Sequence, residues 1–197
     1  GAAANTIFVM DFATNTLLGT ISTPVAVRNI AYDEGADGFW CGNWGDPPTL
    51  VDRSGSTIAS LTTGLAGQYG SAYDGWSDGG PYLWVFDQGA GAGTPQLVHQ
   101  YDLNTLTATG FTYDVASDFP AAAGIAGGLW TGEGVVSGTV SIGGLLQGTP
   151  DNFFVYELTE AGAAWLQIVN ATSGSIAPMD QFDIQLRVYG TTDPEDS

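Results

Sequence analysis

The chain of 197 residues contains no lysine, one histidine and one cysteine. Its basic residues are Arg28, Arg53 and Arg187, against 21 acidic residues, and the net charge is −18. Such a surface repels phosphate backbones and anionic lipid headgroups, so we expect neither nucleic-acid binding nor membrane binding. Because Cys41 is alone, no disulfide can form within the chain, and we expect this thiol to be buried and inert.

The sequence also has little of what a membrane span or a catalytic site requires. No apolar run approaches the roughly 18 residues that a membrane span needs. His99 lies among apolar, strand-forming residues without a Gly-x-Ser-x-Gly motif, which favours a structural role over a catalytic triad. A histidine-based zinc site cannot be built from one His and one Cys. Any acidic chain offers pairs of carboxylates such as those that glycosidases use. We nevertheless expect the protein not to be an enzyme.

Aromatic residues (12 %) and glycine (29 residues) are abundant, which is typical of short strands joined by tight turns. The phrase Ala-Tyr-Asp at 31–33, followed by Asp-Gly-Phe-Trp at 37–40, recurs as Ala-Tyr-Asp at 72–74 and an Asp-Gly turn leading to Trp84. Each copy predicts one hairpin, and the copies lie about forty residues apart, as the units of a repeat architecture do.

A second phrase recurs four times as an apolar strand that ends at an acidic residue before a polar turn. The acidic residues are Asp11, Asp52, Asp102 and Glu157. Such side chains form hydrogen bonds with the backbone of the turn that follows, so we expect a structural role for all four. Their spacing of about 40–55 residues matches four-stranded propeller blades.

The fold class that these repeats predict is all-β, a propeller-like array of about three and a half four-stranded antiparallel blades over residues 1–162. An up-and-down barrel or a sandwich is the alternative. We expect a C-terminal β-sandwich-like strand pair over 163–190 and a polar tail over 191–197. The expected blades cover 26–63, 68–113 and 121–160, the last with strands at 127–130, 138–143 and 153–157, and residues 5–22 supply the outer half of an earlier blade.

The segments 31–55 and 82–103 resemble propeller-type repeats in large secreted surface proteins of the Bacteroidetes. The segment 165–178 is similar to the opening strands of the bacterial Ig-like domains that often follow such propellers. This resemblance implies an extracellular or cell-surface location and no particular activity. The blades are fewer than a closed propeller normally has, and an Ig-like domain needs about seven strands. We therefore expect a fragment, or a subunit whose open ends are completed by its neighbours.

Two kinds of candidate site follow from the loops. Two loops each contain a pair of carboxylates four residues apart with glycine between them, Asp33 with Asp37 and Asp74 with Asp78. Such a pair can belong to a calcium ligand set, or the loops can be ordinary β-turns. Calcium is the one cofactor that the sequence suggests. Tryptophans in loops can stack on a sugar or another ligand, and Trp44 and Trp76 are the candidates. Trp40 and Trp84 recur at a strand position, which predicts a place in the core.

Taken together, these features predict a non-catalytic extracellular structural module. Unpaired strand edges are templates for pairing with another chain, so we expect self-association, or association with other surface proteins, in a filament or a surface layer. The alternative is a glycan- or protein-binding propeller fragment of a larger secreted adhesin or enzyme.

Overall fold

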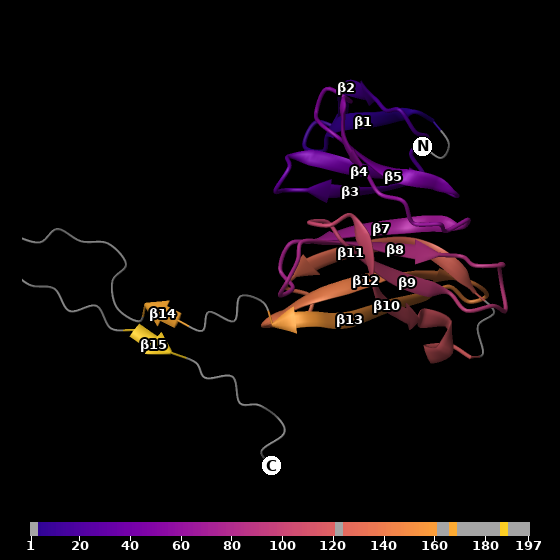
Figure 1. Cartoon of the computed structure of the whole chain (residues 1–197), viewed down its shortest axis with the longest axis vertical. Coiled ribbons are helices and arrows are strands. Elements are labelled where there is room, and N and C mark those ends of the chain that lie inside the picture. The colour runs from indigo at the N-terminus through magenta and orange to yellow at the C-terminus, as the bar shows by residue number, and fades with distance from the viewer. Residues whose placement is uncertain (1–3, 121–123, 161–165, 169–185, 189–197) are drawn as a thin grey trace, which may run out of the picture.

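The computed structural model describes residues 4–120, 124–160, 166–168 and 186–188, and these residues form an all-β structure with one 3-10 helix, η1 (Val115–Asp118) (Figure 1). Consecutive strands pair antiparallel into five sheets. The strands, sheet by sheet, are β1 (Thr6–Asp11) and β2 (Thr16–Ser22); β3 (Asn29–Asp33), β4 (Gly38–Asn43), β5 (Asp46–Val51) and β6 (Thr57–Ser60); β7 (Gln68–Asp74), β8 (Tyr82–Asp87), β9 (Leu97–Asp102) and β10 (Thr107–Asp114); β11 (Ile125–Glu133), β12 (Thr139–Gln147) and β13 (Asn152–Glu160); β14 (Leu166–Ile168) and β15 (Leu186–Val188).

The all-β prediction is confirmed, and the two expected units at 26–63 and 68–113 are the four-stranded sheets β3–β6 and β7–β10. The third expected unit is a sheet of three strands, each longer than predicted. Of the expected C-terminal pair, β14 and β15 lie antiparallel, with Gln167 opposite Arg187. The rest of 163–190 and the tail 191–197 lie outside the described residues, and the Ig-like assignment stays a prediction.

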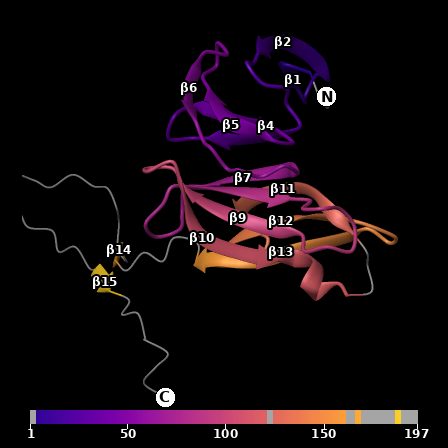
Figure 2. The same ribbon diagram turned by 45° about the vertical axis from the view of Figure 1, so that its right-hand side comes forward.

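The sheet β7–β10 is the middle layer of the stack (Figure 2). One apolar cluster lies between it and β3–β6 and contains Trp40, Leu61 and Leu83. A second cluster lies between it and β11–β13 and contains Phe86 and Phe154, whose rings meet edge to face at 5.5 Å. Because apolar layers cover both faces of the middle sheet, β8 is an almost continuous buried run rather than an alternating one.

A buried hydrogen bond between an aspartate and an indole occurs in both four-stranded sheets. Trp40 Nε1 donates to Asp33 Oδ2 at 3.0 Å, and Trp84 Nε1 donates to Asp74 Oδ2 at 3.1 Å. The other carboxylate oxygen caps the turn after the first strand, accepting from Ala36 N in one copy and from the backbone of the β7–β8 turn in the other. Each aspartate therefore fixes both a turn and a core tryptophan, and the prediction that Trp40 and Trp84 are core residues is confirmed.

The turn role of the second phrase is confirmed for three of its four acidic residues. Asp11 accepts from Ala13 N, Asp52 from the backbone of residues 54 and 56, and Asp102 from Asn104 N. Hydrogen bonds lower the pKa of all three carboxyls, chiefly from the Thr14 side chain for Asp11, from the Ser54 side chain for Asp52 and from the Asn104 backbone for Asp102. The prediction is wrong for Glu157, because β13 continues through it to residue 160 and pairs it with Ser141 of β12.

The first strands of neighbouring sheets, β3, β7 and β11, lie closest together. At Gly70 of β7 an added Cβ would lie 2.6 Å from the carbonyl oxygen of Gly127 and 2.8 Å from Leu129 N, so two backbones touch there. Two buried glutamines strengthen the same junction. Gln88 Nε2 donates to the Ala126 carbonyl at 2.8 Å, and Gln96 Oε1 accepts from Ala126 N at 2.8 Å.

Cys41 is fully buried in β4, as the sequence predicted. Burial raises the pKa of its thiol to about 11, so little reactive thiolate exists at neutral pH. Within the described part of the chain, no helix is long and apolar enough to cross a membrane.

Candidate functional site

A cleft of about 570 Å³ lies between the outer strands of β7–β10 and strand β13. We call it the aromatic cleft, because six of its lining residues are aromatic: Tyr82, Trp84, Phe111, Tyr113, Phe154 and Tyr156. Trp84 and Phe111 meet at an interplanar angle of 89°, and Tyr113 and Tyr156 at 67°. Phe154 and Tyr156, by contrast, are stacked at 5.2 Å with an interplanar angle of 30°. The lining therefore combines steeply angled pairs of rings with one stacked pair.

Acidic groups surround these rings. Asp78 and Glu157 line the cleft and are exposed. Asp118, at the end of η1, accepts a hydrogen bond from the hydroxyl of Tyr156 at 2.5 Å and from that of Tyr113 at 2.9 Å. The hydrogen bond to Asp118 and burial raise the pKa of Tyr113, and burial followed by the same carboxylate raises the pKa of Tyr156. Both phenols remain protonated at neutral pH.

A second, smaller groove of about 300 Å³ follows the first strands β3, β7 and β11. Trp76, one of the two predicted ligand-binding tryptophans, lines it together with Tyr32, Trp130 and Glu34. No spacing in the sequence joins Tyr32 and Trp130 to Trp76, because sheet packing brings these three rings together from three separate sheets.

Trp44, the other predicted ligand-binding residue, lies in a different environment. The guanidinium of Arg28 lies 4.4 Å from the centroid of its ring, and the ring of Tyr69 meets it edge to face at 6.0 Å. The Arg28 side chain also donates to Asn43 at 3.1 Å. One face of Trp44 is thus occupied by an internal cation, which leaves it less free for a ligand than Trp76.

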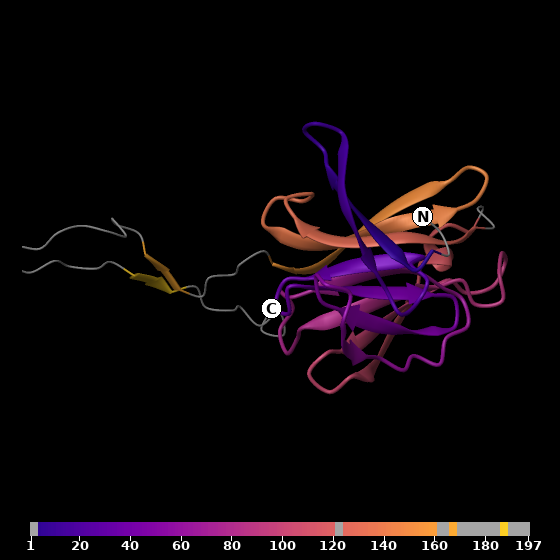
Figure 3. The ribbon, with the colours of Figure 1, turned by 90° about the horizontal axis from the view of Figure 1, so that it is seen from above.

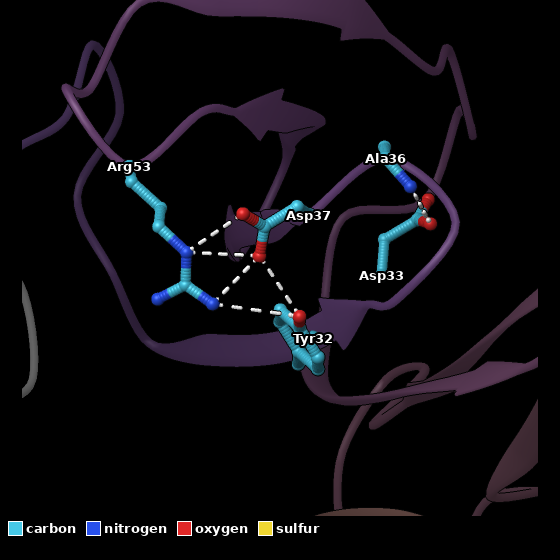
Figure 4. Close-up of polar contacts among 5 residues, drawn as sticks. All are labelled: Tyr32, Asp33, Ala36, Asp37 and Arg53. Carbon is cyan, nitrogen blue, oxygen red and sulfur yellow. Dashed lines mark hydrogen bonds and ion pairs between the residues drawn. The ribbon is translucent and has the colours of Figure 1, made fainter.

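The predicted calcium residues are engaged with protein groups. Asp33 and Asp74 are buried and bind the indoles and turns described above. Asp37 forms an exposed ion pair with Arg53 at 2.6 Å and accepts from the Tyr32 hydroxyl, and these contacts lower the pKa of its carboxyl (Figure 4). Asp78 faces the aromatic cleft instead. Among the described residues, no three His, Cys, Asp or Glu side chains are grouped as metal ligands, and calcium binding stays a prediction.

The β1–β2 hairpin exposes large apolar side chains on both of its faces. Its base is closed by Thr23 N donating to Asn5 O, and Ile21 is buried. Beyond the base the hairpin projects past the sheets beneath it (Figure 3). Phe12 is 95 % exposed and Leu18 is 67 % exposed. The exposed apolar set, which we call the hairpin surface, is Phe8, Val9, Met10, Phe12, Leu17 and Leu18.

The opposite end of the stack is formed by β13 (Figure 1). No strand pairs with the outer edge of β13 among the residues that the structure describes. Successive side chains of β13 point to opposite faces of the sheet. Phe154 therefore lies in the core, whereas Phe153 is 80 % exposed and Val155 is 43 % exposed. Val155 lies opposite Gly143, which lies opposite Trp130 of β11. We call Phe153, Val155 and the free edge of β13 the sheet-end surface.

His99 lies in β9 between Val85 and Thr112 of the neighbouring strands. Burial lowers the pKa of its imidazole, partly offset by the negative charge of Asp87. Its Nε2 is buried and has no hydrogen-bond partner among the described residues. Among the described residues no serine or cysteine is hydrogen-bonded to it, and the structural role of His99 stays a prediction.

No protein-family model matches the chain, and no curated protein matches it. Among solved structures, one described as "Structure of U3-55K" is similar to this chain with 12 % sequence identity and a TM-score of 0.43. The alignment covers 79 % of this chain and 47 % of that one, so the chain spans about half the length of the structure it matches. A likeness of this extent carries no information about function.

Proposed function

We propose that the protein is a non-catalytic extracellular structural module that self-associates head to tail through open β-edges, as a subunit of a filament or a surface layer. The observation that carries this proposal is the pair of exposed apolar surfaces at opposite ends of one stack, the hairpin surface and the sheet-end surface (Figures 1 and 2). Contiguous exposed apolar groups of this kind mark protein contacts. The extracellular location rests on the resemblance to secreted surface proteins.

Charge restricts which surfaces of two copies can meet. Each copy has a net charge of −18, so copies repel one another unless they meet where ionisable groups are sparse. Residues 6–22 carry one ionisable side chain, Asp11, whereas Asp151, Glu157 and Glu160 lie in or beside β13. The hairpin end is therefore the end at which a second acidic copy approaches at low electrostatic cost.

The two surfaces differ in structure, so the contact between them is heterologous and does not close on itself in a dimer. The hairpin of one copy would lie against Phe153 and Val155 of the next and extend the sheet at the free edge of β13. Main-chain hydrogen bonds along a strand edge supply affinity in such complexes, and apolar side chains supply specificity.

We further propose that the sheets are blades of a propeller-like arrangement. The close approach of β3, β7 and β11, with Gly70 against Gly127, supports it, because first strands converge in such folds while outer strands diverge. The aromatic cleft between the outer strands fits that divergence.

The test of self-association uses two variants that each remove one end. Phe12→Ser/Leu18→Ser weakens the hairpin surface, and Phe153→Lys/Val155→Lys weakens the sheet-end surface, since lysine protects strand edges. By analytical ultracentrifugation we expect the unaltered chain to form species that grow with concentration. Each variant alone should stay monomeric, and an equimolar mixture should form a dimer and nothing larger.

Ile58→Ser is the matched control, because Ile58 is an exposed apolar strand residue outside both surfaces. It should associate as the unaltered chain does. A chain that is monomeric at high concentration would contradict the proposal, and so would growth that persists in either end variant.

The alternative function, glycan binding, is favoured by one observation, the meeting of Tyr32, Trp76 and Trp130 beside Glu34 in the smaller groove. Aromatic rings with a neighbouring carboxylate suit a neutral sugar, which offers apolar faces and hydroxyl donors. On a glycan array, Trp76→Ala should abolish any retained signal and Trp44→Ala should leave it intact. Equal effects of the two changes would contradict this location.

A further inference from the structure

The aromatic cleft combines three features that the proposed self-association does not use. It lies on the inner face of β13, where Phe154 and Tyr156 point, whereas the sheet-end surface uses Phe153 and Val155 on the other face. Its volume of about 570 Å³ is in the range of small-molecule sites. Its walls combine pairs of rings at steep angles with the stacked rings of Phe154 and Tyr156.

The charge around the cleft has one sign. Asp78 lies in its wall, and Asp118 holds the hydroxyls of Tyr113 and Tyr156. Among the described residues that line the cleft none is basic. Among residues 4–160, both arginines are engaged elsewhere, Arg28 on Trp44 and Arg53 on Asp37. The field in the cleft is therefore negative and has no internal cation to neutralise it.

Neighbouring protein groups fix the position of the Trp84 ring in the cleft wall. Its indole N–H is bound to the buried carboxylate of Asp74, and Phe111 of β10 packs edge to face against it at 5.6 Å. The hydroxyls of Tyr113 and Tyr156 are fixed in the same way by Asp118. The rings are positioned before any ligand arrives, which reduces the entropy that binding would cost.

We propose that the aromatic cleft binds an organic cation that carries a quaternary ammonium group. The negative faces of aromatic rings attract such a cation, and a quaternary ammonium is weakly hydrated and needs no hydrogen-bond acceptor of its own. Asp78 complements its charge from the rim, and Asp118 does so beside the two tyrosine hydroxyls. A neutral ligand gains from the rings but not from the carboxylates, and an anion is repelled by them.

The experiment compares choline with its neutral isostere, in which carbon replaces the quaternary nitrogen, by isothermal titration calorimetry. It uses the Phe12→Ser/Leu18→Ser chain, so that association of the protein does not contribute heat. We expect choline to bind at least about tenfold more tightly than the isostere, a difference of about 1.4 kcal/mol that desolvated cation–π contacts can supply. Added NaCl should weaken the binding of choline and leave that of the isostere unchanged.

Three variants locate the site. Tyr113→Leu should weaken choline binding about fivefold, while Tyr113→Phe, which keeps the ring, should retain most of it. Asp78→Asn should weaken it about threefold through the lost charge. Tyr32→Leu is the matched control, because Tyr32 is an exposed tyrosine outside the cleft, and it should have no effect.

Several results would overturn the proposal. Equal affinity for choline and its isostere would make the cleft a plain apolar pocket. Absence of binding in the folded chain, or binding unchanged by Tyr113→Leu, would remove the site. Binding of maltose that depends on Tyr113, without binding of choline, would assign the cleft to a neutral glycan instead.

Discussion

Replacing Asp74 by Asn is expected to lower the free energy of unfolding by about 3 kcal/mol, because a buried donor left without an acceptor costs about 1–3 kcal/mol. Asp74 is fully buried and accepts from the Trp84 indole, Trp76 N and Ser77 N. An asparagine has one acceptor oxygen, so its amide group must face either the indole or the backbone donors of the turn. Urea unfolding followed by tryptophan fluorescence measures the loss.

The control is Asp52→Asn, in which the same chemical change is made at a turn near the surface. Asp52 binds the backbone of the turn after β5, where water can replace the lost acceptor. Its effect should be much smaller than that at Asp74, and Asp33→Asn should resemble Asp74→Asn because Asp33 holds Trp40 in the same way. Equal losses at positions 52 and 74 would show that the indole hydrogen bond contributes little.

Replacing Gly70 by Ala should cost about 3 kcal/mol, at the upper end of what overpacking a core costs, because the methyl group has no space. Its Cβ would lie 2.6 Å from Gly127 O and 2.9 Å from Leu129 Cβ, and the oxygen belongs to the backbone of the next sheet. The sheets must separate, which also strains the hydrogen bonds that join Gln88 and Gln96 to Ala126. Thermal unfolding by circular dichroism measures the change.

Gly128→Ala is the matched control for this prediction. Gly128 lies in β11 at the same junction, and an added Cβ there meets nothing within 4 Å. This change should be neutral or slightly stabilising, because alanine restricts the unfolded chain more than glycine does. A Gly70→Ala chain as stable as the Gly128→Ala chain would show that the two sheets are not in rigid contact.

Local chemistry made much of the fold predictable. The turns after Asp52 and Asp102 follow from an acidic residue at a strand end, which needs only neighbouring backbone groups. The hairpins follow from the repeated Tyr-Asp and Gly-aromatic phrases, and Trp40 and Trp84 lie in the core where the repeat placed them. Glu157 was misjudged because its strand is extended by pairing with β12, which no local signal records.

The sites were less predictable, because they depend on how sheets pack. Asp33 and Asp74 suggested metal ligands, yet the pairing of Ala31 with Trp40 and of Ala72 with Trp84 brings each indole within reach of an aspartate two residues along the same face. Aligning the two hairpins of the repeat by their strand pairing shows that each aspartate lies near a tryptophan on the same face. The aromatic cleft draws on residues from Ser77 to Thr159, and no spacing in the sequence brings such distant segments together.

The order of strands has a consequence for how the chain folds. In each described sheet from β1 to β13, every strand pairs with the strand next to it in sequence, and no strand must wait for a distant partner. Pairing of neighbouring segments keeps loop closure fast and lets units fold one after another as the chain emerges. We therefore expect the contacts of Gln88 and Gln96 with Ala126 to form after the sheet β7–β10, joining it to the sheet that follows in sequence.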